Sequence, residues 1–286
     1  MYYKRIFLSL GIVCITVLAI AQSTLDSILY DFHNRPDRVL VAAHRAEHPD
    51  FPENSIAAMK AAIRLGVDFI ETDIRETKDG VMIIMHDKTV DRTTTGKGLV
   101  ANMTYAELQQ LFLLHNGKPT TEKIPTFKEV LELVKGKVML DIDYKAEGKR
   151  AAKSTARLLR KTKIEKQALF FLYDYKDAPA LRRMNKKIQF MMRAYSREDV
   201  DGIFNQGIEI PVIHADAKFY SDSLMGVIRG KGIRLWMNAL GRYDKMERAE
   251  RNSGFDSLLQ MQHTNIIQTD LYEELMAYLK LRSLHR

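Results

Sequence analysis

Two histidines and two acidic residues follow short apolar runs, where the ends of buried strands are expected. His44 follows residues 39–43, Glu71 and Asp73 follow residues 67–70, and His86 follows residues 81–85. Because alternate residues of a strand point the same way, Glu71 and Asp73 would project together as oxygen ligands for a hard divalent cation. Histidines beside such a cation suit proton transfer near neutral pH. The pattern indicates metal-assisted hydrolysis.

Six short motifs spread over residues 44–94 resemble the glycerophosphodiester phosphodiesterase family. They read His44-Arg45-Ala46, Pro52-Glu53-Asn54-Ser55, Glu71-Thr72-Asp73, Thr77-Lys78-Asp79-Gly80, His86-Asp87 and Arg92-Thr93-Thr94. One such piece is a weak signal, but six in order at ordinary spacing are a strong one. The resemblance is faint after about Tyr144. It implies a phosphoric diester hydrolase that releases an alcohol and glycerol 3-phosphate from a glycerophosphodiester.

The resemblance also implies roles for individual side chains. His44 and His86 correspond to the general acid and base, and which histidine is which stays open. Glu71, Asp73 and Asp143 form the expected metal set. Three carboxylates, together with water and a substrate oxygen, suit calcium or magnesium. Zinc is disfavoured because the two histidines are assigned to proton transfer and the chain after its N-terminal segment has no cysteine.

Two cations and one tryptophan complete the expected site. Arg45 and Lys145 would hold the phosphate oxygens, the first as a planar fork and the second as a point charge, while also balancing the carboxylates. Trp236 matches part of a family motif at a strand end and would pack against glycerol or another polyol, with a core position as the alternative. The segment Gln268-Thr269-Asp270 resembles the family's closing motif and is interpreted as mainly structural.

Two positions depart from the family pattern. Ala46 replaces a glycine, which would cost roughly 1 kcal/mol if the backbone there has positive φ. Asp143 replaces a glutamate and is shorter by one methylene. These departures keep open a catalytically inactive phosphodiester-binding protein on the same scaffold. A phospholipase-like enzyme that acts on another phosphodiester is a further alternative.

The elements that would position these residues alternate between strand and helix. Apolar strand-like runs occur at residues 39–43, 67–70, 138–142, 169–172, 188–192, 210–213, 233–236 and 266–268, with helical patterns between them. Eight such units over about 250 residues predict an α/β fold of the (β/α)8 TIM-barrel type. Barrels of this type carry their chemistry at the C-terminal ends of the strands, where the expected site residues fall.

One segment interrupts this alternation. Lys78-Asp79-Gly80 is a turn sequence that would return residues 81–85 antiparallel beside the second strand and bring His86 level with Asp73. A helix is expected at residues 104–112. We therefore predict a hairpin-plus-helix insertion at about residues 75–125 of a single domain.

The first 21 residues have the features of a secretory signal peptide. Lys4 and Arg5 precede an apolar run at residues 6–20, and Ala19-Ile20-Ala21 fits a cleavage site. An uncleaved anchor helix is the alternative, although the run is short for a span of about 20 residues. Cleavage would leave a domain of residues 22–286, periplasmic, with no membrane span and without Cys14.

The net charge of +8 and pI near 9.3 favour an anionic small-molecule substrate. The lysines and arginines look scattered, without interleaved aromatics, a helix-turn-helix or zinc-ligand spacing, so nucleic acid is not expected as a partner. The sequence leaves open the oligomeric state, the headgroup alcohol and the choice between calcium and magnesium.

Overall fold

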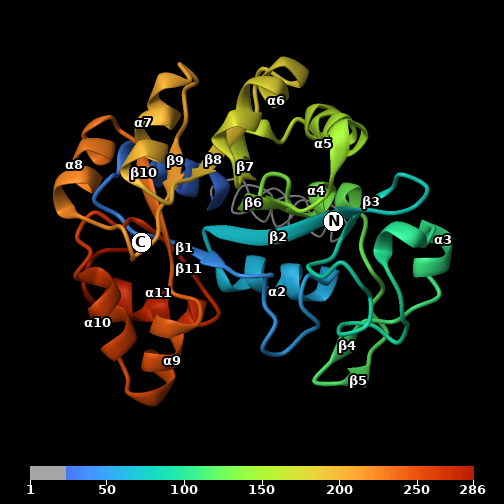
Figure 1. The fold of residues 1–286 in the computed structure, drawn as a ribbon. Helices are drawn as coiled ribbons and strands as arrows, with labels where there is room; N and C mark the ends of the chain where they lie inside the picture. The colour runs from blue at the N-terminus through green and yellow to red at the C-terminus, as the bar shows by residue number, and fades with distance from the viewer. Residues whose placement is uncertain (1–23) are drawn as a thin grey trace, which may run out of the picture.

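A computed structural model, which describes residues 24–286, shows eight parallel strands that close into a barrel (Figure 1). The expected signal peptide lies outside the described residues. The barrel strands are β1 (Leu40–Ala43), β2 (Phe69–Glu76), β6 (Met139–Tyr144), β7 (Ala168–Leu172), β8 (Gln189–Arg193), β9 (Val212–His214), β10 (Arg234–Asn238) and β11 (Ile266–Thr269). The barrel closes because β1 pairs with both β11 and β2. The predicted fold class is confirmed.

Strand alternation divides the apolar residues between two cores. Leu40 and Ala42 of β1 belong to a cluster inside the barrel, whereas Val41 and Ala43 pack outward against the helices. Since both faces of each strand are buried, the strands appear in the sequence as continuous apolar runs. The eight strands were therefore recognised as continuous apolar runs, and not by an alternation of apolar and polar residues.

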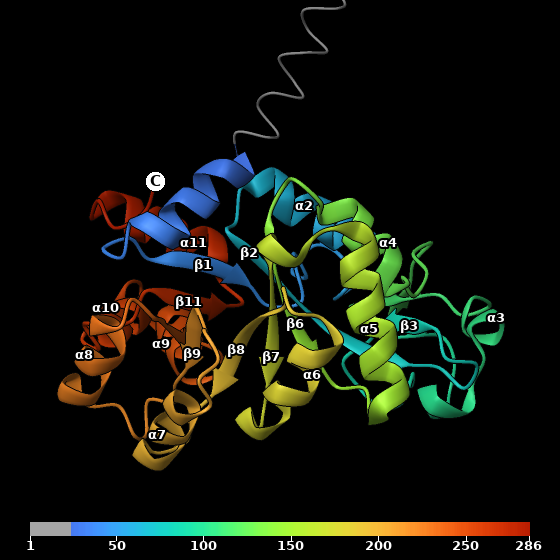
Figure 2. The same cartoon turned by 90° about the horizontal axis from the view of Figure 1, so that it is seen from above.

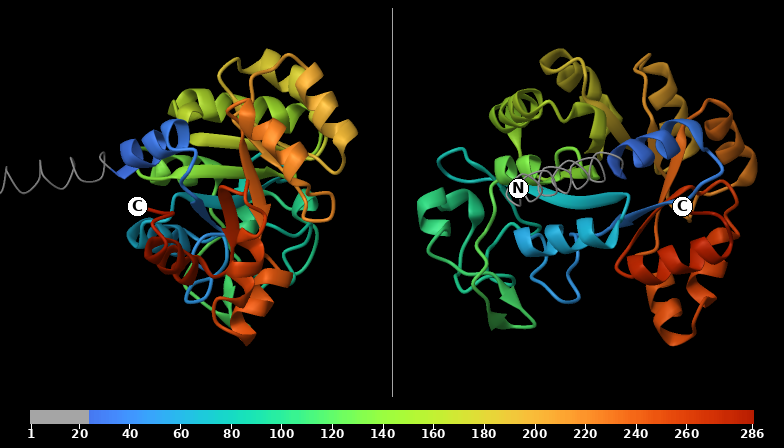
Figure 3. Two further views of the ribbon diagram at one scale, coloured as in Figure 1. Left: turned by 90° about the vertical axis from the view of Figure 1, so that its left-hand side faces the viewer. Right: turned by 180° about the vertical axis from the view of Figure 1, so that it is seen from behind.

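Helices cover the outside of the barrel, as two further views show (Figures 2 and 3). They are α2 (Ile56–Leu65), α4 (Phe127–Val134), α5 (Gly148–Thr162), α6 (Ala178–Met184), α7 (Arg197–Asn205), α8 (Asp222–Gly230), α9 (Arg242–Ala249), α10 (Ser253–Leu259) and α11 (Tyr272–Leu281). The Ser55 side chain caps α2 by accepting a hydrogen bond from the amide of Ala58, and Gly66 ends that helix at φ 82°. Thr126 and Glu129 form a capping box on α4.

The insertion after β2 follows the predicted course with one addition. Strand β3 (Met82–Ile84) runs antiparallel to β2, and the amide of Met85 donates to the carbonyl of Asp73 at 3.0 Å, which places His86 level with the acidic pair. Helix α3 (Tyr105–Leu108) is shorter than predicted because a turn follows its single capped segment. A small hairpin of β4 (Leu114–His115) and β5 (Lys118–Pro119) was not predicted.

The amino ends of the strands are sealed by a helical segment at residues 24–34. The buried guanidinium of Arg234 donates to the carbonyls of Phe32, Arg35 and Arg38 at 2.7–3.1 Å. These hydrogen bonds satisfy carbonyls at the end of that helix. Within residues 24–286, no helix is both long enough and apolar enough to cross a bilayer.

Candidate active site

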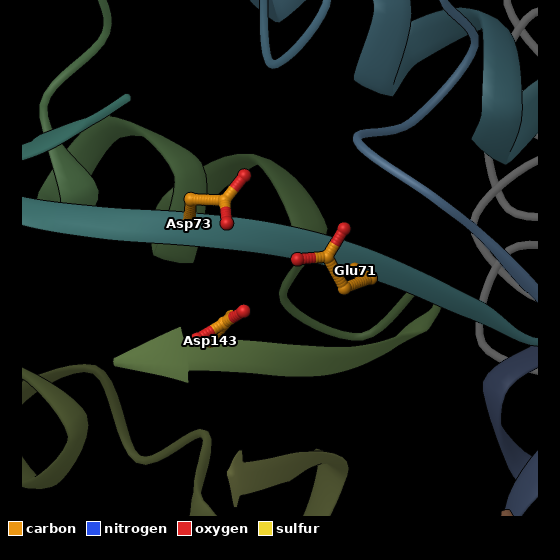
Figure 4. Close-up of side chains that lie close together, drawn as sticks. All are labelled: Glu71, Asp73 and Asp143. Atoms are coloured by element: carbon orange, nitrogen blue, oxygen red, sulfur yellow. The ribbon is translucent and has the colours of Figure 1, made fainter. Parts of the chain in front are cut away.

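Three carboxylates from two neighbouring strands converge at the carboxyl ends of the barrel strands. In the parallel register of β2 and β6, Glu71 pairs with Asp141 and Asp73 pairs with Asp143. Glu71 and Asp73 project from β2 toward the end of β6, which carries Asp143 (Figure 4). Ligand oxygens of Glu71, Asp73 and Asp143 all lie within 4.8 Å of one another. The structure therefore brings together the three predicted metal ligands.

These carboxyl groups are crowded by like charges. Burial raises the pKa of Glu71 well above its usual value, and the charges of Asp73 and Asp143 add to this effect. Burial and the charge of Asp143 also raise the pKa of Asp141 well above its usual value. The Oδ1 atom of Asp141 is buried with no hydrogen-bond partner among the described residues. Such a cluster needs added positive charge to remain ionised.

The two predicted catalytic histidines are each oriented by a neighbouring aspartate. The Nδ1 atom of His44 lies 2.7 Å from Asp270 Oδ1, and its Nε2 atom lies 4.0 Å from Glu71 Oε2. The Nδ1 atom of His86 lies 2.6 Å from Asp87 Oδ1. A carboxylate at Nδ1 favours the tautomer with the proton on that nitrogen, so Nε2 is left to exchange protons.

Both orienting carboxylates are held in the ionised form. Arg92 donates to Asp87 at 2.7 Å and, against the opposing effect of burial, lowers the pKa of that carboxyl group. Burial is the largest single influence on Asp270 and opposes its ionisation, but the hydrogen bond with His44 and the nearby charges of His44, His48 and Arg248 together lower the pKa of Asp270. Each aspartate is therefore an acceptor that keeps its histidine in one orientation near neutral pH.

The two predicted phosphate-binding cations lie beside the carboxylates. The Nζ atom of Lys145 is 2.6 Å from Asp143 and 3.2 Å from Asp73. These two charges raise the pKa of Lys145 although burial opposes them. Arg45 donates to Glu53 at 3.0 Å, and its Nε atom lies 3.8 Å from Asp73. Glu53 therefore braces Arg45.

A cavity of about 250 Å³ opens between this cluster and the opposite wall of the barrel. His44, His86 and the acidic residues line one side. The other side is lined by polar and aromatic residues of the later strands and their loops, including Tyr173, Arg193, His214, Asn238 and Gln268. Arg193 donates to His214 Nε2 at 2.6 Å and to Asp216 at 2.8 Å, so its guanidinium is fixed. The cavity has a charged reactive side and a preformed polar wall.

Residues 44–201, more than half of the chain, match the model of the glycerophosphoryl diester phosphodiesterase family. The chain belongs to this family. The matched region contains both histidines, all three carboxylates and both cations. The family match therefore covers the β2 and β6 side of the cavity and part of the opposite wall, while His214, Asn238, Leu240 and Gln268 lie beyond the matched residues.

Curated relatives of this family match less than half of the chain. A glycerophosphodiester phosphodiesterase of Caldanaerobacter subterraneus subsp. tengcongensis is 44% identical over 112 residues, which are 38% of this chain and 46% of that protein. One from Bacillus subtilis is 36% identical over 135 residues, which are 44% of each protein. The chain thus spans less than half the length of these two relatives.

Solved structures of the family share the fold over most of the chain. A glycerophosphoryl diester phosphodiesterase from Parabacteroides distasonis superposes with a TM-score of 0.77 at 24% identity, covering 90% of this chain and 92% of that one. A phosphodiesterase from Oleispira antarctica, in complex with the product sn-glycerol-3-phosphate, gives a TM-score of 0.70 at 19% identity and covers 85% and 97%. The barrel is therefore shared even where sequence similarity is low.

The two departures from the family pattern have different consequences in the structure. Ala46 is fully buried with φ 64°, in the left-handed region that favours glycine, and it is not among the residues that line the cavity. Asp143 still reaches the carboxylate cluster, where its two oxygens each lie 2.9 Å from the hydroxyl of Tyr173. The alanine is thus a backbone cost, and the aspartate retains its place in the site.

The structure adds a contact for one late residue, Asp270, and places another, Trp236, in the core position that was its alternative. Asp270, interpreted as mainly structural, is the partner of His44, because β11 pairs with β1 and brings Thr269 beside Ala43. Trp236, expected against a polyol, is fully buried inside the barrel and does not line the cavity. Its Nε1 atom donates to Asn238 and Gln268 at 3.1 and 3.3 Å. Trp236 orients two cavity residues and does not itself offer a surface to the substrate.

The donor set fits a hard divalent cation. Three carboxylates from adjacent strands offer oxygen ligands within 4.8 Å of one another, and burial, together with the neighbouring carboxylates, raises the pKa values of Glu71 and Asp143. Oxygen-only ligands of this kind suit calcium or magnesium. Among the residues that the structure describes, this is the one group with metal-ligand spacing.

Proposed function

We propose that this chain hydrolyses glycerophosphodiesters to an alcohol and glycerol 3-phosphate, with calcium or magnesium held by Glu71, Asp73 and Asp143. The observation that carries the proposal is the convergence of these carboxylates in a cavity that His44 and His86 also line. The names of the relatives, and the glycerol 3-phosphate product held by the Oleispira enzyme, point to the same reaction.

The cations of the site bind and orient the substrate phosphate. Arg45, braced by Glu53, and Lys145, held between Asp73 and Asp143, supply fixed positive charge beside the cavity. Their charge lowers the repulsion that a phosphodiester anion presents to an incoming nucleophile. A bound divalent cation supplies further positive charge to the phosphate oxygens.

The histidines move the protons. One Nε2 atom takes a proton from the attacking oxygen, which is a water or a neighbouring substrate hydroxyl, and the other Nε2 gives a proton to the departing alkoxide. The phosphorus–oxygen bond to the alcohol breaks as the new bond forms. Attack by water gives glycerol 3-phosphate directly, whereas attack by a substrate hydroxyl gives a cyclic phosphodiester, which water then opens to glycerol 3-phosphate with the two histidines in exchanged roles. Asp270 and Asp87 hold the two rings so that both Nε2 atoms are free for these transfers.

The test is hydrolysis of glycerophosphodiesters with choline, ethanolamine, glycerol and inositol headgroups by the protein without its first 21 residues. Each assay is run with chelator, and then with calcium or magnesium restored. His44→Ala is the reaction control, and His115→Ala, in the exposed β4–β5 hairpin, is the matched histidine control. We expect metal-dependent release of glycerol 3-phosphate that falls roughly a thousandfold in His44→Ala and is unchanged in His115→Ala.

The alternatives give different results in the same assay. No turnover of any diester, together with retained binding of the substrates, would favour a binding protein on this scaffold. Turnover of a different phosphodiester, with the same dependence on metal and His44, would favour the phospholipase-like alternative. Turnover that survives chelation would contradict the metal assignment.

We also propose that the chain is exported to the periplasm. Support comes from the sequence alone, where Lys4 and Arg5 precede the apolar run and the small-x-small site at residues 19–21. Fractionation of cells that express the full chain, followed by N-terminal sequencing, checks this. We expect a soluble periplasmic product that begins near residue 22, whereas a full-length product in the membrane would contradict cleavage.

A further inference from the structure

A row of cations runs along the exposed side of α5. All five of its residues are exposed: Lys149, Lys153, Arg157 and Lys161 follow the i, i+4 spacing that places side chains on one helix face, and Arg160 lies beside them at i+3 from Arg157. From the first to the last, the row is about 18 Å long at 1.5 Å per helical residue. The sequence shows scattered lysines and arginines, but the helix brings these five into line.

This row has no negative charge within its own helix. Residues Gly148–Thr162 include no aspartate or glutamate, and the opposite face, with Ala152, Thr155 and Leu159, is buried against the barrel. Like charges at i, i+4 destabilise a helix by roughly 0.2–0.5 kcal/mol per pair. The ion pairs of the described residues include none to Lys153, Arg157 or Arg160. The repulsion within the row is therefore not relieved by the folded chain.

A hollow beside the row could hold an anionic group. It has a volume of about 250 Å³ and lies where α5 meets α6, lined by Lys153, Arg157 and Arg160 with an apolar floor of Ala156 and Met184. Helices α5 and α6 lie side by side in both views of the ribbon (Figures 1 and 2). Exposed Arg183, Lys186 and Lys187 extend the positive surface across α6 and the turn that follows it. The row thus continues into a wider basic face.

We propose that this face docks on an anionic phospholipid surface, with one lipid phosphate seated among Lys153, Arg157 and Arg160. A convex helix with a line of flexible cations matches a flat anionic surface, and clusters of this size are typical of electrostatic membrane association. A nucleic-acid strand fits less well because the exposed aromatic residues of the described chain lie outside α5 and α6, so bases would find no stacking partner. The row begins just after the carboxyl end of β6 and runs toward the amino ends of the strands, where Lys186 and Lys187 precede β8, so the proposed docking face is separate from the cavity.

The test is co-sedimentation of the protein, without its first 21 residues, with vesicles. One set contains phosphatidylcholine alone, and the other contains equal parts of phosphatidylcholine and phosphatidylglycerol. The test variant is Lys153→Gln/Arg157→Gln/Arg160→Gln. The matched control, Lys60→Gln/Lys245→Gln/Lys280→Gln, removes the same charge from exposed positions on α2, α9 and α11. Glutamine keeps a good helix former at each position, and circular dichroism checks the fold.

We expect binding to the anionic vesicles alone, weakening with salt, and on the order of a hundredfold weaker for the test variant than for the control. Equal loss in both variants would show that net charge, and not this face, drives binding. Equal binding to both vesicle types would overturn the proposal. Displacement from vesicles by duplex DNA at the same phosphate concentration would assign the face to nucleic acid. None of these outcomes depends on whether the protein hydrolyses a diester.

Discussion

At the carboxyl ends of the strands, several carboxyl groups crowd around one cavity, whereas at the amino ends each buried charge faces partners of its own. Glu71 and Asp141 have pKa values raised by burial and by their acidic neighbours. At the other end, Asp68 accepts from the amide of Val41 at 2.8 Å and pairs with Arg286, while Arg234 donates to several carbonyls. Acidic side chains that crowd together mark the functional end, whereas the structural end holds its buried charged groups through separate hydrogen bonds and ion pairs.

The largest expected effect is a loss of catalytic rate from a change at the carboxyl ends of the strands, with stability unchanged. Replacing Asp270 by Asn removes the carboxylate that fixes the His44 tautomer, so we expect kcat to fall roughly 10²–10⁴-fold with little change in KM. Asp256→Asn, at an exposed carboxylate on α10, is the matched control. Steady-state kinetics and thermal unfolding of both variants check this. A loss of stability that explains the loss of activity would contradict a positioning role for Asp270.

At the amino ends of the strands we expect the opposite result, a loss of stability with little loss of activity. Arg234→Met removes the side-chain donor from the carbonyls of Phe32, in the 24–34 helical segment, and Arg38, in the turn after it, each at a cost of roughly 1–3 kcal/mol. We expect the free energy of unfolding to fall by at least about 3 kcal/mol, while kcat of the remaining folded enzyme stays near normal. Urea unfolding measures the first quantity. If Arg234→Met unfolds like the parent protein, the amino end is not held together as described.

His214, in the polar wall of the cavity, should contribute to the pH dependence of the free energy of unfolding. Burial, and then the charge of Arg193, lower the pKa of His214 well below 6.5. The unfolded chain then binds a proton below pH 6.5 that the folded chain does not, so stability present above this pH is lost as the pH falls. The free energy of unfolding between pH 7 and 5 should therefore fall less steeply in His214→Gln.

A second buried histidine, His285, also contributes to the pH dependence of the free energy of unfolding. Burial also lowers the pKa of His285, at the opposite end of the barrel, so part of the slope should remain in His214→Gln. An unchanged slope in this variant would mean that His214 is protonated in the folded protein. That result would remove the acceptor that fixes Arg193.

The smallest effect concerns the backbone beside His44. Ala46 has φ 64°, and glycine adopts this conformation without the strain of a Cβ atom. Ala46→Gly should raise the free energy of unfolding by about 1 kcal/mol and leave activity within a small factor. Gly66→Ala, at φ 82° on the end of α2, should shift stability in the opposite direction. A destabilised Ala46→Gly would show that the Ala46 methyl group packs favourably.

Much of this arrangement could be predicted from local sequence. The apolar runs located all eight barrel strands, and the Asp79-Gly80 turn predicted the return of β3. The chemistry at strand ends then followed from the fold, since parallel strands of a barrel all deliver their last residues to one face. Glu71 and Asp73 were therefore found without knowledge of any contact.

What could not be predicted depends on contacts between distant strands. The pairing of His44 with Asp270 requires the closure of β1 on β11, and local sequence does not report this closure. The interior position of Trp236 depends on the phase of β10, which a continuous apolar run leaves undefined. The β4–β5 hairpin was overlooked although Asn116 and Gly117, both at positive φ, are a recognisable hairpin turn.

The most direct test of the contrast between the two ends is calorimetric titration of the chelator-treated protein with calcium and with magnesium. We predict one binding site in the parent protein and none in Glu71→Gln, which should also be more stable than the metal-free parent because it removes a buried charge from the acidic cluster. Asp68→Asn, at the opposite end, should bind the metal normally if it folds. Absence of binding by the parent protein, or binding that survives Glu71→Gln, would contradict the assignment of the crowded carboxylates as a metal site.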